Sequence, residues 1–337
     1  MKPIFLPCLV NEPLDDPALY IDFLFEKRAI LFDLGDLHLL PPRKILRVSQ
    51  VFVSHTHMDH FYGFDRMLRI FLGRDKRLQL FGPPGFIDRV EHRLASYTWN
   101  LVEGFSVDFT IIAGEFDGRD LRTARFRCRN RFLRECEAVS PTVDGVLLDD
   151  DSFRIRAVIL DHRIPCLAFT LEEKNHVNIM KDRLQKLGFP VGPWLTELKT
   201  AVLRGDPDKI PFRVWWRKDG VVQERFLDFE FLKKEIVRIV PGQKITYVTD
   251  VVNSPQNILR IREFAAGSDY FFIEAMFLHE EEERAREKYH LTARQAGRLA
   301  RQAGVARVIP FHFSAKYSGF AEELCREVVE AFEGQVQ

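Results

Sequence analysis

Apolar residues along this chain fall into short runs that are separated by charged or turn-forming residues. The runs at 18–25 and 29–32 flank the charged turn 26–28, a pattern that predicts a β-hairpin. Further runs rich in β-branched and aromatic residues predict strands at 48–53, 78–81, 155–160, 212–216, 220–226, 244–249, 268–272 and 305–310. Helical spacing and charge predict helices at 86–97, 279–288 and 292–303, and one that begins at Ser254. Strands with helices between them predict an α/β fold.

Residues that bind metals follow directly after the strand predicted at 48–53. The turn 54–60 reads Ser-His-Thr-His-Met-Asp-His, so His55, His57, Asp59 and His60 lie within a few residues of one another. Neutral imidazole and carboxylate are the usual ligands of zinc and related divalent ions. A catalytic ion normally takes three protein ligands, so four such groups predict two ions that share the turn. A chance cluster is the alternative, and it is improbable because the chain has only 10 histidines in 337 residues.

Three other predicted strands also end at a residue that can bind a metal. His162 follows the strand at 155–160, and it is the best candidate for a further ligand of the first ion. His312 follows the strand at 305–310. Asp250 follows the strand at 244–249, where it either caps the next helix or offers one oxygen to each of two ions. Asp33, after the hairpin, is either a carboxylate that orients a ligand histidine or an ordinary turn residue.

Arginine is concentrated between residues 119 and 134. Arg125, Arg127, Arg129 and Arg131 alternate with other residues, and in a strand this alternation places all four guanidinium groups on one face. Such a face either binds phosphates or protects an edge strand against aggregation, and the sequence leaves both interpretations open.

The segment 172–210 differs in character from its surroundings. It is rich in lysine and arginine, and glycines and prolines between 187 and 194 interrupt regular structure. A short helix is expected at 180–186. A structureless loop of this length is uncommon inside a compact domain, so we expect an arm that projects from the core.

Composition adds little about partners. Lys plus Arg and Asp plus Glu both number 49, so nucleic-acid binding requires local basic patches. The five cysteines are scattered and lack a C-x-x-C pair, which is typical of reduced thiols in a cytoplasmic protein. No signal-like segment and no long apolar run are present, so we expect no membrane association.

The motif H-x-H-x-D-H after an apolar strand is also the signature of the metallo-β-lactamase superfamily, and within it the chain resembles the ribonuclease Z family. That family consists of endonucleases that remove the 3′ trailer of precursor tRNA. The matching segments are 53–60 for the metal motif, 81–85 for a G-P-x-G turn, 187–193 with 198–199 for the arm motif, 289–296 for H-S-T-x-x-Q-A, and 311–317 for the closing T-H-x-S-x-R-Y.

The resemblance implies an αββα sandwich with two zinc ions, for which manganese or magnesium is an alternative. It implies one domain over 1–337, an inserted tRNA-binding arm at 172–210, precursor tRNA as partner, and a cytoplasmic homodimer. His55, His57 and His162 would hold one ion, Asp59, His60 and His312 the other, and Asp250 would bridge them. A hydroxide shared by the ions would attack phosphorus, and Asp59 would orient this hydroxide or take its proton. His290 would protonate the leaving oxygen. The alternative for His290 is a helix-capping histidine. Ser314 and Lys316 would contact the phosphate, and Gly192 and Pro193 would belong to the arm that grips tRNA.

The chain departs from the family pattern in several places. The N-terminal G-T-G loop is replaced by residues 7–17, and the H-E-A-T-F motif reads Ile-Glu-Ala-Met-Phe at 273–277. The G-D-T turn reads Thr-Asp-Val at 249–251, and the closing arginine is Lys316. Every expected ligand is retained, yet a hydrolase of a smaller phosphodiester such as a cyclic nucleotide stays an alternative. An RNA-binding protein without turnover is a third hypothesis, which the intact ligand set disfavours.

Overall fold

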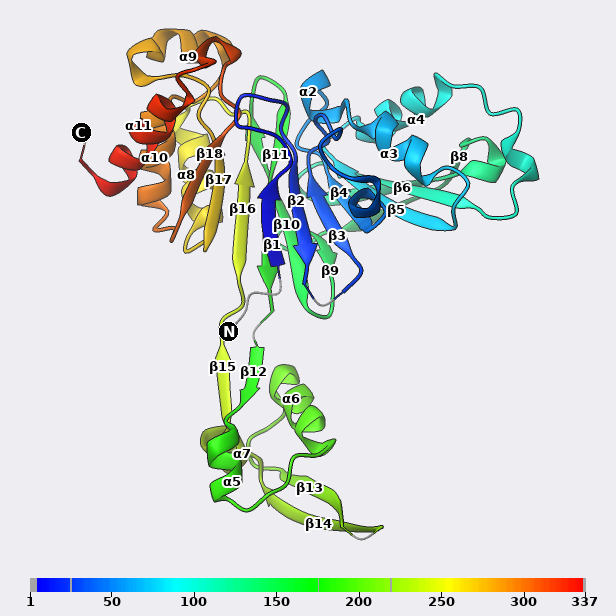
Figure 1. The fold of residues 1–337 in the computed structure, drawn as a ribbon, viewed down its shortest axis with the longest axis vertical. Helices are drawn as coiled ribbons and strands as arrows, with labels where there is room; N and C mark the ends of the chain where they lie inside the picture. Colours follow the sequence, from blue (N-terminus) through cyan, green and yellow to red (C-terminus); the bar gives the residue numbers. More distant parts are fainter. Residues whose placement is uncertain (1–4, 25, 175, 219, 336–337) are drawn as a thin grey trace. The chain divides into compact units, whose positions relative to one another are not determined.

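The computed structural model describes residues 5–24, 26–174, 176–218 and 220–335. The chain forms two compact units, one made of residues 1–172 and 243–337, the other of Glu173–Gly242 (Figure 1).

The first unit contains an eight-stranded sheet in the order β1 to β8. Its strands are β1 (Phe5–Leu9), β2 (Leu19–Phe23), β3 (Ala29–Phe32), β4 (Val48–Phe52), β5 (Lys76–Gly82), β6 (Phe109–Phe116), β7 (Asp120–Arg127) and β8 (Arg134–Pro141). Strands β3 to β6 run parallel, and the outer pairs are antiparallel. The predicted hairpin at 18–32 is confirmed as β2–β3.

A six-stranded sheet follows the order β18-β17-β16-β11-β10-β9. Its strands are β9 (Val146–Asp149), β10 (Phe153–Asp161), β11 (Pro165–Glu173), β16 (Lys244–Val248), β17 (Tyr270–Glu274) and β18 (Val308–Phe311). Strands β16, β17 and β18 are parallel, with helices between them.

Helices cover the outer face of each sheet (Figure 1). Those near the first sheet are α1 (Pro42–Ile45), α2 (Met58–Phe61), α3 (Phe64–Phe71) and α4 (Phe86–Ala95), and those near the second are α8 (Pro255–Ala265), α9 (Glu282–Lys288), α10 (Ala293–Gln302) and α11 (Ala321–Glu333). One apolar cluster joins α3 and α4 to the first sheet, another joins α8, α10 and α11 to the second, and a third lies between the sheets. These three clusters separate four layers, so the expected αββα sandwich is confirmed.

This layering brings strand ends together. In parallel strands the carboxyl ends share one edge of the sheet. A predicted ligand follows within three residues of the end of β4 in the first sheet and of β16 and β18 in the second. The N-terminal segment also reaches this edge, because the amide of Phe313 donates to the carbonyl of Pro13 over 2.7 Å.

The second unit is longer than the predicted arm. It has its own apolar cluster, in which Trp194 and Leu198 of α6 (Trp194–Arg204) pack with Leu232 of α7 (Phe229–Ile236). Its other elements are β12 (His176–Ile179), α5 (Lys181–Lys186), β13 (Pro211–Lys218), β14 (Val221–Asp228) and β15 (Val237–Val240). The expected limits of 172–210 therefore end too early, because the hairpin β13–β14 and helix α7 belong to the same core.

The two ends of this unit lie side by side. A Cβ added to Gly242 would lie 2.1 Å from the carbonyl oxygen of Glu173, so only glycine allows this approach. In the first unit, Glu172 of β11 pairs with Lys244 of β16. The chain thus leaves the second sheet and returns to it on neighbouring strands.

The predicted four-arginine strand face is wrong. Strand β7 ends at Arg127, residues 128–130 form a 3₁₀ turn, and Arg131 has left-handed backbone with φ of 53°. Arg125 and Arg127 both pair with Glu135 of β8, and Arg131 pairs with Glu103. β7 is an interior strand, since β8 covers it, so the edge-protection interpretation also fails.

Within the described residues, no helix is long and apolar enough to cross a bilayer.

The layer between the sheets provides a test of the fold. The ring of Phe169 lies 5.4 Å from that of Phe32 and 5.7 Å from that of Phe52, and all three are fully buried. We expect Phe169→Ala to lower the free energy of unfolding by about 3–5 kcal/mol in urea titrations, because it leaves a cavity. The control Leu39→Ala, at a side chain 68% exposed, should change it by less than about 0.5 kcal/mol. Equal effects would contradict this packing.

Candidate metal centre

All seven predicted ligands meet at the shared strand edge. They form two groups, one of His55, His57, His162 and Asp250, the other of Asp59, His60 and His312, and within each group the ligand atoms lie within 4.8 Å of one another. A third group overlaps both and adds His290 to Asp250 and His312. The turn after β4 supplies four of these residues, and the ends of β10, β16 and β18 supply one each.

Asp250 lies between the two groups. Its Oδ2 is 3.6 Å from Nε2 of His55 and 3.5 Å from Nε2 of His162. Its Oδ1 is 2.8 Å from Nδ1 of His312 and 3.5 Å from Nε2 of His60. Each oxygen therefore faces one group, which is the arrangement of a bridging carboxylate. Asp250 does not cap the next helix, because the Ser254 side chain accepts from the amide of Asn257 there.

Asp33 fixes the orientation of His60. Its carboxylate accepts from the amide and hydroxyl of Ser54, at 2.6 and 2.8 Å, and from the hydroxyl of Tyr247 at 2.9 Å. Nδ1 of His60 lies 2.9 Å from the same carboxylate, so Nε2 of His60 faces the cluster. Asp33 therefore occupies the place of an orienting carboxylate, and not that of an ordinary turn residue.

Three buried ring nitrogens have no hydrogen-bond partner in the described structure: Nε2 of His55, Nε2 of His60 and Nδ1 of His312. The approach of His312 Nδ1 to Asp250 is short but lacks the geometry of a hydrogen bond. Buried polar atoms without partners are rare and require an explanation. Imidazole nitrogens aimed at carboxylate oxygens fit divalent cations, which would occupy the space between them.

The electrostatics of the cluster are uneven. Burial and the charge of His60 lower the pKa of His55 to about 2, which keeps this ring neutral. Burial also disfavours the charged forms of His60 and His312, but Asp250 outweighs it, so the pKa of His60 is raised well above its usual range and that of His312 to about 10. Burial acts to raise the pKa of Asp250, but His312 and His60 hold it well below its usual value. His60 and His312 would therefore exchange protons for cations.

His290 lies beside the cluster and is held by a carboxylate. Nδ1 of His290 is 3.0 Å from Glu274, whose other oxygen accepts from the amide of Val251 at 2.7 Å. Burial acts to lower the pKa of His290, but Glu274 outweighs it and the pKa is raised. The helix-capping alternative fails, because α10 is capped by a capping box of Thr292 and Gln295.

Sequence reasoning missed the supporting role of Glu274. Glu274 belongs to the altered motif at 273–277, and its position at the end of a predicted strand could have indicated this role. The hydroxyl of Tyr247 and the carbonyl of Tyr289, which accepts from Nδ1 of His162 over 2.9 Å, carried no sequence signal.

Ser314 and Lys316, the predicted phosphate contacts, are not among the residues that line the cavity at the cluster. Lys316 forms an ion pair with Glu281, and the amide of Ser314 donates to the carbonyl of Met276. Gly192 and Pro193 lie at the start of α6 in the second unit.

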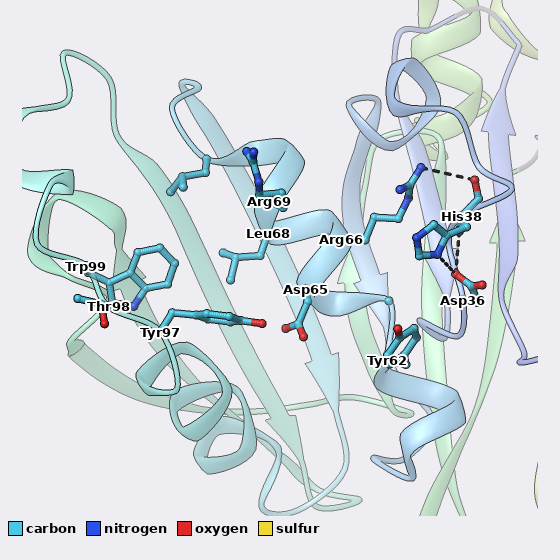
Figure 2. Close-up of a pocket in the computed structure, with 12 residues that line it drawn as sticks. Asp36, His38, Tyr62, Asp65, Arg66, Leu68, Arg69, Tyr97, Thr98 and Trp99 are labelled. Carbon is cyan, nitrogen blue, oxygen red and sulfur yellow. Dashed lines mark hydrogen bonds and ion pairs between the residues drawn. The ribbon is translucent and has the colours of Figure 1, made fainter.

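A cavity of about 390 Å³ opens onto the metal centre. Its lining includes ligands of both groups, together with His290 and five residues that the sequence did not single out: Arg163, Ile164, Met276, Lys288 and Tyr289. A larger cavity of about 550 Å³ lies against α3 and is lined by Tyr62, Tyr97 and Trp99 among others (Figure 2). Nδ1 of His38 there lies 2.5 Å from Asp36, and none of the ligand groups found among the described residues lines this cavity.

Comparisons with known proteins agree with this architecture. A family model described as "Beta-lactamase superfamily domain" matches residues 236–313. Ribonuclease Z of Limosilactobacillus fermentum is 30% identical over 94% of this chain and 88% of its own length, and that of Deinococcus radiodurans is 29% identical over 92% and 90%. Among solved structures, human tRNase Z, short form (ELAC1), matches with a TM-score of 0.52 and 17% identity, covering 93% of both chains. The metallo-β-lactamase fold protein YhfI from Bacillus subtilis also matches, with a TM-score of 0.52 and 13% identity. This match covers 97% of this chain and 91% of YhfI. From this identity and coverage, the chain belongs to the ribonuclease Z family of metal-dependent hydrolases in the metallo-β-lactamase superfamily.

Proposed function

We propose that this protein is an endoribonuclease that removes the 3′ trailer of precursor tRNA with two metal ions. The observation that carries the proposal is the pair of ligand groups with Asp250 between them, in a chain whose relatives are named ribonuclease Z.

The donor set favours zinc. His55, His57 and His162 would hold one ion, Asp59, His60 and His312 the other, and Asp250 would bridge them. Five of these seven donors are imidazoles, which suit zinc better than magnesium, while manganese stays an alternative. When bound, such a pair of ions lowers the pKa of water and offsets charge on the phosphate.

The chain's own residues would move protons on either side of the phosphate. Oδ2 of Asp59 lies 3.2 Å from His312 and 3.3 Å from His60, whereas Oδ1 makes no hydrogen bond among the described residues. Oδ1 is therefore available to orient a water or take its proton. His290, with Nδ1 held by Glu274, would present a proton on Nε2 to the leaving 3′ oxygen.

The second unit would bind tRNA without taking part in the reaction at the phosphate. It carries Gly192 and Pro193, and its separate core lets it act as an added binding module. The phosphate contacts of Arg125, Arg127, Arg129 and Arg131 stay a prediction, with a smaller expected effect because Glu135 engages the first two. The cytoplasmic homodimer is likewise proposed from family resemblance alone.

We expect Asp250→Ala to lower bound metal from about two ions per chain and to abolish turnover, because the variant removes an oxygen from each group. Metal content is measured by mass spectrometry after gel filtration. Asp75→Asn, at an exposed carboxylate, is the control and should retain both ions. Unchanged metal content in Asp250→Ala would remove Asp250 from the site.

The protein should lose bound metal as the pH is lowered. The raised pKa values of His60 and His312 mean that both rings carry protons at neutral pH, and each must release its proton before it binds a cation. Lowering the pH favours the protonated rings, so dialysis from about pH 8 to about pH 5 should release metal and lower the melting temperature. His38→Gln, a control at an exposed loop position, should show the same dependence of metal content on pH as the wild-type protein. Metal content independent of pH would contradict the assignment.

Replacing residues 173–242 with a short glycine-serine linker separates binding from chemistry. The ends of the segment adjoin neighbouring strands β11 and β16, so the first unit should still fold without it. We expect kcat/KM for precursor tRNA to fall at least a hundredfold more than kcat/KM for bis(p-nitrophenyl) phosphate, because remote binding energy helps only a substrate that reaches it. Parallel losses on both substrates would favour the small-phosphodiester alternative.

A further inference from the structure

Two cationic side chains line the metal cavity without a carboxylate partner. Arg163 follows the ligand His162, and Lys288 ends helix α9, one residue before Tyr289. Both side chains are exposed, and neither forms an ion pair with any residue that the structure describes. Free positive charge at the mouth of a hydrolytic cleft fits an anionic substrate that extends beyond the reacting phosphate.

The cation expected from the closing motif is engaged elsewhere. Lys316 pairs with Glu281, and its ammonium group lies 4.7 Å from the ring centroid of Tyr317. It is not among the residues that line the metal cavity. Arg163 and Lys288, and not Lys316, are therefore the cations that line this cavity.

Arg163 forms a stacked pair with Tyr289. The guanidinium carbon lies 5.2 Å from the ring centroid, and Tyr289 stays 40% exposed. The backbone ties both residues to the centre, because the carbonyl of Tyr289 accepts from Nδ1 of His162. The amide of Arg163 in turn donates to Asp161 over 2.7 Å.

Both residues of this pair have left-handed backbone, with φ of 64° for Arg163 and 66° for Tyr289. At Tyr289 this conformation ends helix α9, as is common for a helix C-cap. Arg163 lies in the turn after β10, where left-handed backbone is unfavourable for a residue other than glycine. An exposed cation–π pair stabilises a fold only weakly, and the position of this pair at the cavity mouth fits a role in binding.

We propose that Arg163 and Tyr289 hold the nucleotide that adjoins the scissile phosphate in a single-stranded RNA. Arg163 binds the flanking phosphate through its planar guanidinium, and the exposed surface of the Tyr289 ring stacks on the base. This inference rests on the proposed endoribonuclease function and adds a substrate contact that none of the metal ligands provides.

The test compares a long and a short substrate. Arg163→Gln removes the charge, and Tyr289→Asn removes the ring while keeping a residue that tolerates left-handed backbone. For each variant we expect kcat/KM on precursor tRNA to fall roughly tenfold or more, the range for the loss of one stacking contact. The fall on bis(p-nitrophenyl) phosphate should be several times smaller, because that diester has no flanking phosphate or base. Arg326→Gln, an exposed arginine on α11, is the control.

Binding of a short single-stranded RNA, followed by fluorescence anisotropy, tests the contact without turnover. Arg163→Gln should flatten the slope of log affinity against log salt by about 0.7, and Arg163→Lys should retain it. An unchanged slope, or equal loss of activity on both substrates, would overturn the proposal and reduce the pair to a support for His162. If the wild-type protein binds this RNA through Arg163 but does not cleave precursor tRNA, the proposed function fails and the nucleotide contact stands.

Discussion

The burial of Asp250 among imidazoles is the constraint on which the rest of this site depends. A carboxylate that is 2% exposed faces four histidines that come from three different strand ends. Desolvating such charges costs several kcal/mol per ion unless opposite charge and hydrogen bonds compensate. The imidazoles cannot compensate fully, because His55 stays neutral and three ring nitrogens lack partners. Divalent cations would relieve both deficits, so the cluster is a costly arrangement for a structural core and a suitable one for a metal centre.

A second layer of groups decides which nitrogen of each ring faces the centre. Asp33 holds His60, the carbonyl of Tyr289 holds His162, and Glu274 holds His290. These three supports come from different parts of the chain, and two of them lie on positions with left-handed backbone, Asp33 at φ of 59° and Tyr289 at 66°. His312 itself has φ of 57°. Tyr289 ends helix α9, where left-handed backbone is common. Asp33 and His312 directly follow β3 and β18, so the packed sheets fix their backbone.

The sequence predicted the strands that carry ligands, because buried parallel strands are continuous apolar runs and the ligands follow them directly. The family resemblance also predicted that His162, Asp250 and His312 would join the 54–60 turn, although that turn follows a strand of the other sheet. Prediction from the sequence failed where it relied on a short local pattern of residues. Alternation in Arg125–Arg131 resembled a strand, but a 3₁₀ turn at 128–130 interrupts it, and Glu135 from the next strand neutralises two of the arginines. The limits of the second unit failed for a similar reason. In the sequence, the hairpin β13–β14 does not differ from any other pair of strands. Only its packing in the same apolar cluster as Trp194 and Leu232 assigns it to the second unit.

The altered motifs leave the ligand positions unchanged. The ligands follow the ends of strands that two sheets hold in place. Of the changed positions, Ile273 is buried in β17 and Val251 is buried beside Asp250, whereas Met276 and Lys316 lie beyond the ends of β17 and β18. Loss of the histidine at 273 leaves Glu274, which still supports His290 and the amide of Val251. Replacement of the closing arginine by Lys316 leaves a cation that Glu281 engages, while Arg163 and Lys288 line the cavity instead. Substrate contacts can therefore shift from one loop to another without disturbing the ligands. Among the described residues, Lys288 and Lys316 form no hydrogen bond with a ligand, and Tyr289 contacts His162 only through its backbone carbonyl. In this chain, divergence of the motifs is better explained by a change in how the substrate is held than by loss of the chemistry.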